Sequence, residues 1–338
     1  MGGLVRKTFK PLADGARILA SEVLGLSAGN IYYVYNAADT AVGSHLRGML
    51  NGVKYDDGST VLHEATSLTA DVAIQAALDS CVANRDDKVV IMPSNTNYSI
   101  TASLAINKKG VHVICPTGLT GNDFPVGNTA RLKSITAATP VFAVAASTEA
   151  FEIAGFYIKN YNDVAAITMA DGVSAQNIHT NAFMLEWASS PVASIVGTGS
   201  AGAWGTIGHN WFISESGTGV TAAIAAVDIK AQATGCRVCN NEVTIGDGNT
   251  ATVGISNLAV KGATNFNVFS SSGGIAVTPS GGAITNCVAI STMGCAIGNR
   301  GAVAASALLS GGTTAHSYCD NMDGATGAGN GAASNLET

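Results

Sequence analysis

Short apolar runs separated by glycine, serine, threonine and asparagine make up most of the chain. From about residue 88 these runs are rich in β-favouring residues and are only a few residues long, which predicts a series of short strands. The clearest predicted strands are 88–93, 98–100, 104–106, 111–114, 151–158, 254–260 and 274–277. The pattern therefore indicates an all-β chain with many tight turns.

One helix is predicted ahead of these strands, beginning after Thr69. Thr69 is suited to cap its N-terminus, and Asp71 lies in the first turn, where the positive end of the helix dipole favours a carboxylate. An apolar stripe at helical spacing follows. It consists of Ile74, Ala77, Leu78, Cys81 and Val82.

A short phrase recurs at irregular intervals in the second half of the chain: an asparagine followed two residues later by Phe or Val. The copies are Asn181-Ala-Phe183, Asn210-Trp-Phe212, Asn241-Glu-Val243, Asn267-Val-Phe269 and, more loosely, Asn286-Cys-Val288. A phrase that returns with insertions between copies is typical of stacked structural coils. Asparagine tolerates left-handed backbone geometry, so stacked copies at a coil corner could form a ladder. The alternative is that these residues are ordinary turn formers in a β-sandwich.

The first 66 residues differ in character from the rest. Residues 15–26 could form a short amphipathic helix, residues 31–35 are predicted to be a strand, and Asn51-Gly52 and Asp57-Gly58 mark turns. The segment is short and varied, so we interpret it as an arm or a small docking module.

The predicted helix and first strands resemble a known family. The stretch Thr69-Ala-Asp-Val-Ala-Ile-Gln-Ala-Ala-Leu-Asp79, then Val89–Pro93, Tyr98-Ser-Ile100 and Leu104-Ala-Ile106, is similar to the entry cap of pectin-lyase-like right-handed β-helices, in the version found in bacteriophage tailspikes. In those proteins the helix covers the open end of the solenoid, and a strand ending in Pro-x-Gly-x-Tyr starts the first coil. Here that ending is loosened to Pro93-Ser-Asn-Thr-Asn-Tyr98.

The resemblance implies a single-stranded right-handed parallel β-helix with a short N-terminal capping helix, assembled as a homotrimer. It covers about residues 67–115 specifically, and the looser coil pattern extends to about residue 325. The predicted division of the chain is an N-terminal arm (1–66), the capping helix and first coil (67–115), further coils (116–322) and a Gly/Ala-rich tail (323–338).

Composition narrows the possible partners. Only 12% of the residues are charged, the net charge is −6, and 12 of the 17 Lys and Arg residues precede residue 140, so there is no basic stripe for nucleic acid. No apolar run approaches the roughly 18 residues that a membrane helix needs, and the N-terminus lacks the apolar core of a signal peptide. The seven cysteines suggest no disulfide framework. We expect no cofactor and no metal.

Polysaccharide cleavage would require paired carboxylates, and the later coils contain few carboxylates. Glycoside hydrolysis usually uses two carboxylates within roughly 5–10 Å of each other. The carboxylates after residue 140 are spread singly, and residues 248–319 contain no Asp or Glu. The best pair is Glu186 and Glu215, each five residues after the asparagine of a neighbouring copy. The simpler interpretation is that both are solvated corner residues.

Two further features are candidates for binding. Trp187, Trp204 and Trp211 lie near the carboxylate pair, and indole rings can stack on sugars, although large aromatics more often pack in a core or an interface. Cys236-Arg-Val-Cys239 has the spacing of half a zinc site. No second pair accompanies it, so buried thiols are the preferred interpretation.

We therefore expect a non-enzymatic phage virion surface protein, a tailspike-like β-helix that decorates or cements the capsid. It would be made in the host cytoplasm and reside on the particle. Its predicted partners are other copies of itself and capsid or tail proteins, docked through Arg6, Lys7, Lys10 and Arg17. The alternative is a tailspike or tail fibre that binds or depolymerises host surface polysaccharide. A secreted pectin-lyase-like enzyme is disfavoured by the absence of an acid cluster and of a signal peptide.

Overall fold

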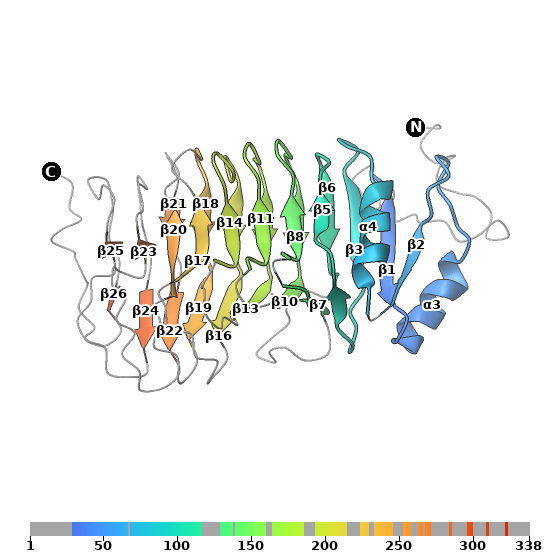
Figure 1. The fold of residues 1–338 in the computed structure, drawn as a ribbon, viewed down its shortest axis with the longest axis horizontal. Helices are drawn as coiled ribbons and strands as arrows, with labels where there is room; N and C mark the ends of the chain where they lie inside the picture. Colours follow the sequence, from blue (N-terminus) through green and yellow to red (C-terminus); the bar gives the residue numbers. More distant parts are fainter. Residues whose placement is uncertain are drawn as a thin grey trace, which may run out of the picture.

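A computed structural model shows three parallel β-sheets and two helices in the residues that it describes (Figure 1). Those residues are 29–66, 68–116, 129–137, 139–159, 164–185, 193–214, 224–229, 233–245, 253–257, 263–265, 268–271, 284–285, 296–299, 309–310 and 322–323. The sheets lie along one elongated body, with the N-terminal strands at one end and the C-terminal strands at the other.

Each sheet contains strands that are far apart in sequence. In spatial order the first sheet has β2 (Leu62–Ala65), β1 (Ile31–Asn36), β3 (Asp87–Ile91), β6 (Val111–Ile114), β9 (Glu152–Ala154), β12 (Asn177–His179), β15 (Thr206–Gly208), β18 (Arg237–Cys239) and β21 (Ala263–Asn265). The second has β4 (Tyr98–Ile100), β7 (Ala130–Ser134), β10 (Phe156–Lys159), β13 (Ala182–Leu185), β16 (Trp211–Ser214), β19 (Glu242–Ile245), β22 (Val268–Ser271), β24 (Ala296–Asn299) and β26 (Met322–Asp323). The third has β5 (Leu104–Ile106), β8 (Phe142–Val144), β11 (Ile167–Met169), β14 (Ile195–Gly197), β17 (Ile224–Ile229), β20 (Val253–Asn257), β23 (Ile284–Thr285) and β25 (Leu309–Ser310).

From β4 to β22 the chain visits the second, third and first sheets in turn. We call three successive strands, one in each sheet, a rung. From β4 to β20 each strand pairs in parallel with the equivalent strand of the next rung, and among the described strands no sheet closes on itself. The prediction of an all-β chain built from short strands is confirmed at this level. The strands predicted at 98–100, 104–106 and 111–114 are β4, β5 and β6.

The stretch predicted as one strand over 151–158 is instead two strands, β9 and β10, and that prediction was wrong. Gly155 separates them with a φ of +87°, which turns the chain from the first sheet to the second. A Cβ at Gly155 would lie 2.5 Å from the carbonyl oxygen of Cys115, so both the turn and the close approach require glycine. The strand predicted at 274–277 lies outside the described residues.

The inward side chains of the three sheets form one continuous apolar core. Parallel register places like residues in columns along the stack. One column of the first sheet contains Val113, Ile153, Ile178, Ile207 and Val238. In the second sheet Phe183 and Phe212 stack with ring centroids 4.9 Å apart. These phenylalanines are the second half of the recurring Asn-x-Phe phrase, which explains its spacing: the asparagine lies at the corner, the next residue points outward and the third points inward.

The asparagines of that phrase form a buried ladder at the corner between the first and second sheets. Asn181 donates its backbone N–H and its side-chain Nδ2 to Asn210 Oδ1, each at 3.1 Å. Asn210 repeats both bonds to Asn241 Oδ1, at 3.0 and 3.1 Å. Each Nδ2 also donates to a strand carbonyl of the preceding rung, and the three residues are at most 2% exposed. The ladder prediction is confirmed for these three, but the left-handed backbone expected of them lies one residue earlier, at Thr180, His209 and Asn240. Asn267 and Asn286 lie outside the described residues.

The first rung is closed by the helix α4 (Ala70–Ser80), which the sequence predicted. Gln75 acts as a substitute strand, because its Oε1 accepts the Ala105 N–H at 2.8 Å and its Nε2 donates to the Ala105 carbonyl at 3.4 Å. Asp71 accepts the backbone N–H groups of Thr101 and Ala102 at 3.1 and 3.2 Å. The helix therefore satisfies backbone groups at the edges of the third and second sheets.

The expected role of Thr69 was wrong in its detail. Thr69 occupies the N-cap position of α4, but its side chain makes no capping bond. Its hydroxyl lies instead 2.8 Å from the hydroxyl of Thr66. Asp71 is in the first turn as expected. It has a second role as well, because it binds the segment of the same chain that begins at Thr101.

Residues 31–65 extend the first sheet beyond α4. Strands β1 and β2 pair next to β3, and the helix α3 (Thr40–Leu50) packs on the outer face of β1 and β2. A small apolar cluster, separate from the main core, lies under α3 and centres on Tyr35, Leu46, Leu50 and Val61. The division of the chain at residue 66 stays a prediction, but the sheet itself continues across it. The helix expected at 15–26 lies outside the described residues.

We expect Asn210→Ala to destabilise the stack by about 3 kcal/mol, because it leaves two buried donors of Asn181 without an acceptor. The measurement is the free energy of unfolding in urea. The control is Asn177→Ala, which removes an exposed side chain on the outer face of β12 in the same rung as Asn181. It should change that free energy by less than about 0.5 kcal/mol. Equal losses in both variants would contradict a structural role for the ladder.

Candidate functional site

Four titratable side chains form a row on the outer face of the first sheet, at the N-terminal end of the stack. His112 lies on β6, Glu152 on β9 and His179 on β12, while Asp86 lies in the turn before β3. Register pairs His112 directly with Glu152, and His179 lies one residue after the inward Ile178. Because strand side chains alternate, the residues that flank the inward column must point outward. We call this group the histidine–carboxylate row.

The row is a continuous chain of short contacts. His112 Nδ1 lies 2.8 Å from Glu152 Oε2, and His179 Nε2 lies 2.7 Å from Glu152 Oε1. His112 Nε2 contacts Asp86 Oδ1 at the other end. His179 Nδ1 lies 2.9 Å from the hydroxyl of Thr180. All four members of the row are partly exposed to solvent.

These contacts fix where the protons must be. An ionised carboxylate only accepts hydrogen bonds, so His112, placed between two carboxylates, needs a proton on both ring nitrogens. His112 is therefore an imidazolium in this arrangement. His179 is different, because the Thr180 hydroxyl can donate to its Nδ1 while its Nε2–H donates to Glu152.

The charges in the row shift its acid–base equilibria in opposite directions. The hydrogen bond to Glu152, helped by Asp86, raises the pKa of His112 despite its partial burial. Hydrogen bonds from His112 and His179 lower the pKa of Glu152 to about 2. Lys88 adds a positive charge beside the row, with its Nζ 3.8 Å from Asp86 Oδ2.

The contacts of the row attach neighbouring strands to one another. Both oxygens of Glu152 and both nitrogens of His112 are engaged with each other or with neighbours. The doubly protonated ring of His112 has no free lone pair with which to act as a general base in this state. The row joins the turn before β3 to β6, β9 and β12 by charge-assisted bonds.

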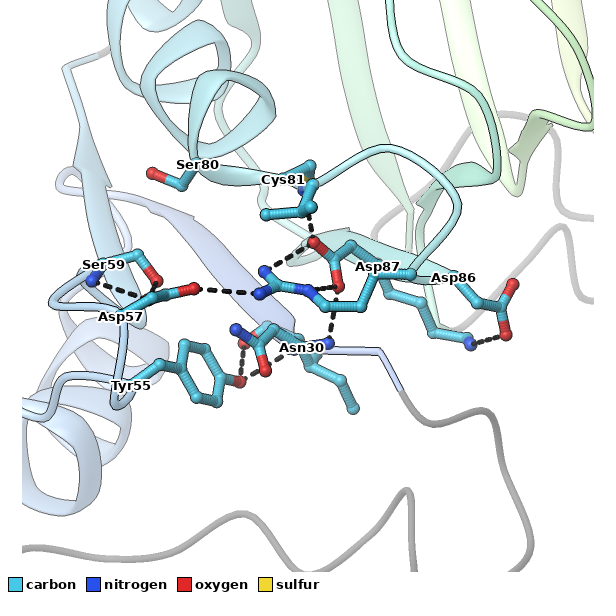
Figure 2. Close-up of polar contacts among 12 residues, drawn as sticks. Asn30, Tyr55, Asp57, Ser59, Ser80, Cys81, Asp86 and Asp87 are labelled. Atoms are coloured by element: carbon cyan, nitrogen blue, oxygen red, sulfur yellow. Dashed lines mark hydrogen bonds and ion pairs between the residues drawn. The ribbon is translucent and has the colours of Figure 1, made fainter.

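A second polar cluster joins the N-terminal segment to the stack (Figure 2). The guanidinium of Arg85 binds Asp87 through two nitrogens, each at 2.7 Å, and binds Asp57 at 2.9 Å. Asp87 is fully buried and also accepts the backbone N–H groups of Asn30 and Val82, both at 2.7 Å. Bonds from Ser59 and Arg85 lower the pKa of Asp57 to about 2.

The Arg85 cluster has a structural function. The fork of the guanidinium spans two segments, the hairpin around Asp57 and the turn that leads into β3. Removing Arg85 would leave the buried Asp87 carboxylate with backbone donors only. The cluster thus fixes residues 29–66 to the first rung.

Most of the sequence-predicted site residues lie outside the described residues: Arg6, Lys7, Lys10, Arg17, Glu186, Trp187 and Glu215. The register of β13 and β16 pairs Leu185 with Ser214, which immediately precede Glu186 and Glu215 in the chain. Whether the two glutamates form a pair therefore stays a prediction. Trp204 and Trp211 are described.

Trp204 presents an exposed indole at the corner between the third and first sheets. Its side chain is 67% exposed, and a Cβ built on Gly235 of the next rung would lie 2.5 Å from indole Cε3. The absence of a side chain at Gly235 therefore leaves room for the ring. The positive φ of Trp204 is not special to it, because Ala150 and Ala175 have positive φ at the equivalent corner of earlier rungs.

Trp211 has a packing role. It lies on the outer face of β16, partly buried against a small cluster of Tyr157, Ala182 and Met184. Those three residues are themselves at most 8% exposed. For Trp211 the structure favours the packing interpretation over the sugar-binding one.

Cys236 and Cys239 lie in different environments. Cys236 is buried in the core, Cys239 is partly exposed, and neither takes part in a disulfide. Burial raises the pKa of Cys236 to about 12 and also raises that of Cys239, so neither is activated as a thiolate. Within the described residues, no group of three or more His, Cys, Asp or Glu side chains could hold a metal ion.

The histidine–carboxylate row was missed by sequence reasoning, which saw six scattered histidines. A signal for it was present. The triplets His112-Val-Ile, Glu152-Ile-Ala and Asn177-Ile-His179 share a central apolar residue, and aligning them on that residue places their polar neighbours on one face.

Comparisons with known proteins add no identification: no protein-family model, curated protein or solved structure matches this chain. Among the described residues, no helix is long and apolar enough to cross a membrane. The function must therefore be argued from the chain itself.

Because of the row, we expect the free energy of unfolding to decrease both when the pH rises and when it falls. The raised pKa of His112 means that its contribution is full below its unfolded pKa of about 6.5 and is lost as pH rises through the folded value. The lowered pKa of Glu152 means that its contribution is present above about 4.5 and is lost as pH falls towards 2. We expect the row to stabilise the fold most between about pH 4.5 and 6.5.

The measurement is the urea midpoint between pH 4 and 9 for the wild type and for His112→Asn. The variant should lose about 2 kcal/mol near pH 5.5 and a smaller amount above the raised pKa of His112. The exposed His209, changed to Asn, is the matched control and should keep the wild-type profile. A His112→Asn profile parallel to the wild type at every pH would show that the row does not carry this dependence.

Proposed function

We propose that this protein is a right-handed parallel β-helix that acts as a non-enzymatic structural protein on the surface of a phage particle, decorating or cementing the capsid. The observation that carries the proposal is the closure of the first rung by α4, through Gln75 and Asp71. These residues belong to the stretch that resembles the tailspike entry cap. They satisfy backbone groups at two sheet edges, which is what a cap on a solenoid must do.

The proposed handedness and closure rest on general rules for parallel sheets. Three successive strands enter three different sheets. The fourth strand returns to the sheet of the first strand, one rung further along, which is the path of a coil. Connections between parallel strands of one sheet are right-handed in about 98% of cases. A single continuous core inside the three sheets supports the same arrangement.

A structural role is supported by how the polar groups are used. In the described residues, the strongest charged contacts of the histidine–carboxylate row and of the Arg85 cluster join strands and turns of the chain to one another. Stacked rungs of this kind resist unfolding, which suits a protein exposed outside the cell. We further propose that three copies assemble, that the N-terminal basic residues dock on the particle, and that the protein is made in the host cytoplasm.

The alternative, a tail appendage that binds host surface glycan, is favoured by one observation. Trp204 offers an exposed indole, with space for its ring made by Gly235 of the next rung. Sugar rings stack on such faces. This candidate predicts binding of host polysaccharide, with or without cleavage by Glu186 and Glu215.

The deciding experiment combines particle association with polysaccharide binding. Purified protein is incubated with phage particles assembled without it, and the pelleted particles are analysed for the bound chain by quantitative mass spectrometry. Under the capsid proposal, the bound chain should be in large excess over tail components, and host polysaccharide should show no new reducing or unsaturated ends. Binding in tail stoichiometry, or depolymerisation, would reject the capsid proposal.

The glycan alternative has its own variant. Trp204→Ala should weaken polysaccharide binding by roughly tenfold, because stacking on one aromatic ring contributes about 1 kcal/mol or more. Ile135→Ala removes another exposed apolar side chain, 40% exposed, and should leave binding unchanged. Equal binding by Trp204→Ala and the wild type would remove the indole from the alternative.

A further inference from the structure

The N-terminal edges of the three sheets differ in whether side chains of the chain bond to their backbone groups. At the edge of the third sheet, the side-chain amide of Gln75 pairs with both backbone groups of Ala105. Next to the edge strand of the second sheet, Asp71 accepts two backbone N–H groups, and Asn36 donates to the carbonyls of residues 96 and 97. Side chains of this chain therefore occupy two of the three edges.

The first sheet instead ends in an open strand. β2 is the last strand of that sheet, and β1 is its one neighbour among the described residues. The Tyr33 N–H bonds to the Val61 carbonyl, and the Ala37 N–H bonds to the Ala65 carbonyl. Odd-numbered residues of β2 therefore face β1. Because alternate residues face opposite sides, Leu62 and Glu64 turn their N–H and C=O groups away from the sheet.

We propose that β2 is a docking strand, which takes an extended segment of a particle protein as an added strand of the first sheet. This inference rests on the proposed function and identifies the place where the protein attaches. Free N–H and C=O groups at two-residue spacing are recognised by another strand, because only an extended backbone matches that spacing. Figure 1 shows β2 and α3 beyond the capping helix, at the N-terminal end of the body.

The side chains along β2 indicate the chemistry of the incoming strand. Leu62 and Glu64 point to the face that carries α3, and Leu62 packs against the apolar cluster under that helix. Glu64 is about half exposed; its Oε2 accepts the Tyr35 hydroxyl and lies 3.5 Å from Arg47 Nη1 in a long ion pair. A segment with an apolar residue beside Leu62 and a basic residue beside Glu64 would complement both.

A second copy of this chain is the competing occupant, and the side chains that would face each other argue against it. Antiparallel pairing of two copies through Leu62 and Glu64 would place each leucine opposite the carboxylate of the other copy.

The test compares Leu62→Pro with Leu62→Ala in binding to particles assembled without this protein. Both variants lose the leucine side chain, but only proline removes the outward N–H, which the pairing with β1 does not use. We expect Leu62→Pro to bind roughly tenfold more weakly than Leu62→Ala, corresponding to about 1.4 kcal/mol. Sedimentation of the free protein reports any self-association.

Hydrogen exchange on the wild type provides a measurement that needs no variant. The amides of Leu62 and Glu64 should exchange quickly in the free protein and become protected on particles, while those of residues 63 and 65 are protected in both states. Equal binding by the two variants, with no new protection, would overturn the docking strand and leave the proposed function standing. Self-association that Leu62→Pro abolishes would assign the edge to a second copy and overturn the proposal. No wild-type binding to particles would overturn both.

Discussion

The buried asparagine ladder is the interaction on which the stack depends. At the corner between the first and second sheets the backbone turns through a left-handed residue, Thr180, His209 or Asn240, and leaves its next N–H inside the protein. A buried N–H without an acceptor is costly. Asn210 provides that acceptor for the preceding rung and uses its own amide to bond to Asn241 and to a strand carbonyl. Asn181 and Asn210 therefore each need an asparagine one rung further on. This requirement fixes the register of neighbouring rungs more strictly than apolar packing, which tolerates many residues in its columns.

In a stack held by repeated contacts, only the ends leave core side chains and backbone groups without partners. Inside, each strand satisfies its neighbours, whereas an end exposes both core and backbone. The N-terminal end solves most of this problem with local sequence, since Asp71 and Gln75 of α4 satisfy backbone groups in the second and third sheets. The first sheet is extended further by β1 and β2, and the buried pair of Arg85 and Asp87 attaches this extension to the first rung. The end is therefore a built structure in its own right, and among the described residues no side chain pairs with the outer edge of β2.

The sequence was sufficient for the elements whose signals are local. The helix at α4, the strands β4, β5 and β6 and the corner asparagines were predictable, because periodicity and turn chemistry act over a few residues. The histidine–carboxylate row was not, because His112 and Glu152 become neighbours only once the register between rungs is known. The Arg85 cluster had no local signal, since Asp57, one of the partners of Arg85, lies in a hairpin that is distant in the sequence. The single strand predicted over 151–158 failed because Gly155 makes a corner of what looked like a continuous alternation.

Function on such a fold must be sought along columns of equivalent residues. The corner column of Ala150, Ala175, Trp204 and Gly235 shows this, since all four have positive φ and most residues there have little or no side chain. Trp204 departs from that rule, and Gly235 in the next rung makes room for it. A large exposed indole is not needed to make the corner, because alanine makes the same corner in two earlier rungs. Stacking of the rungs therefore does not require the combination of Trp204 and Gly235. In contrast, the ladder and the histidine–carboxylate row are explained in full by the contacts that hold the rungs together.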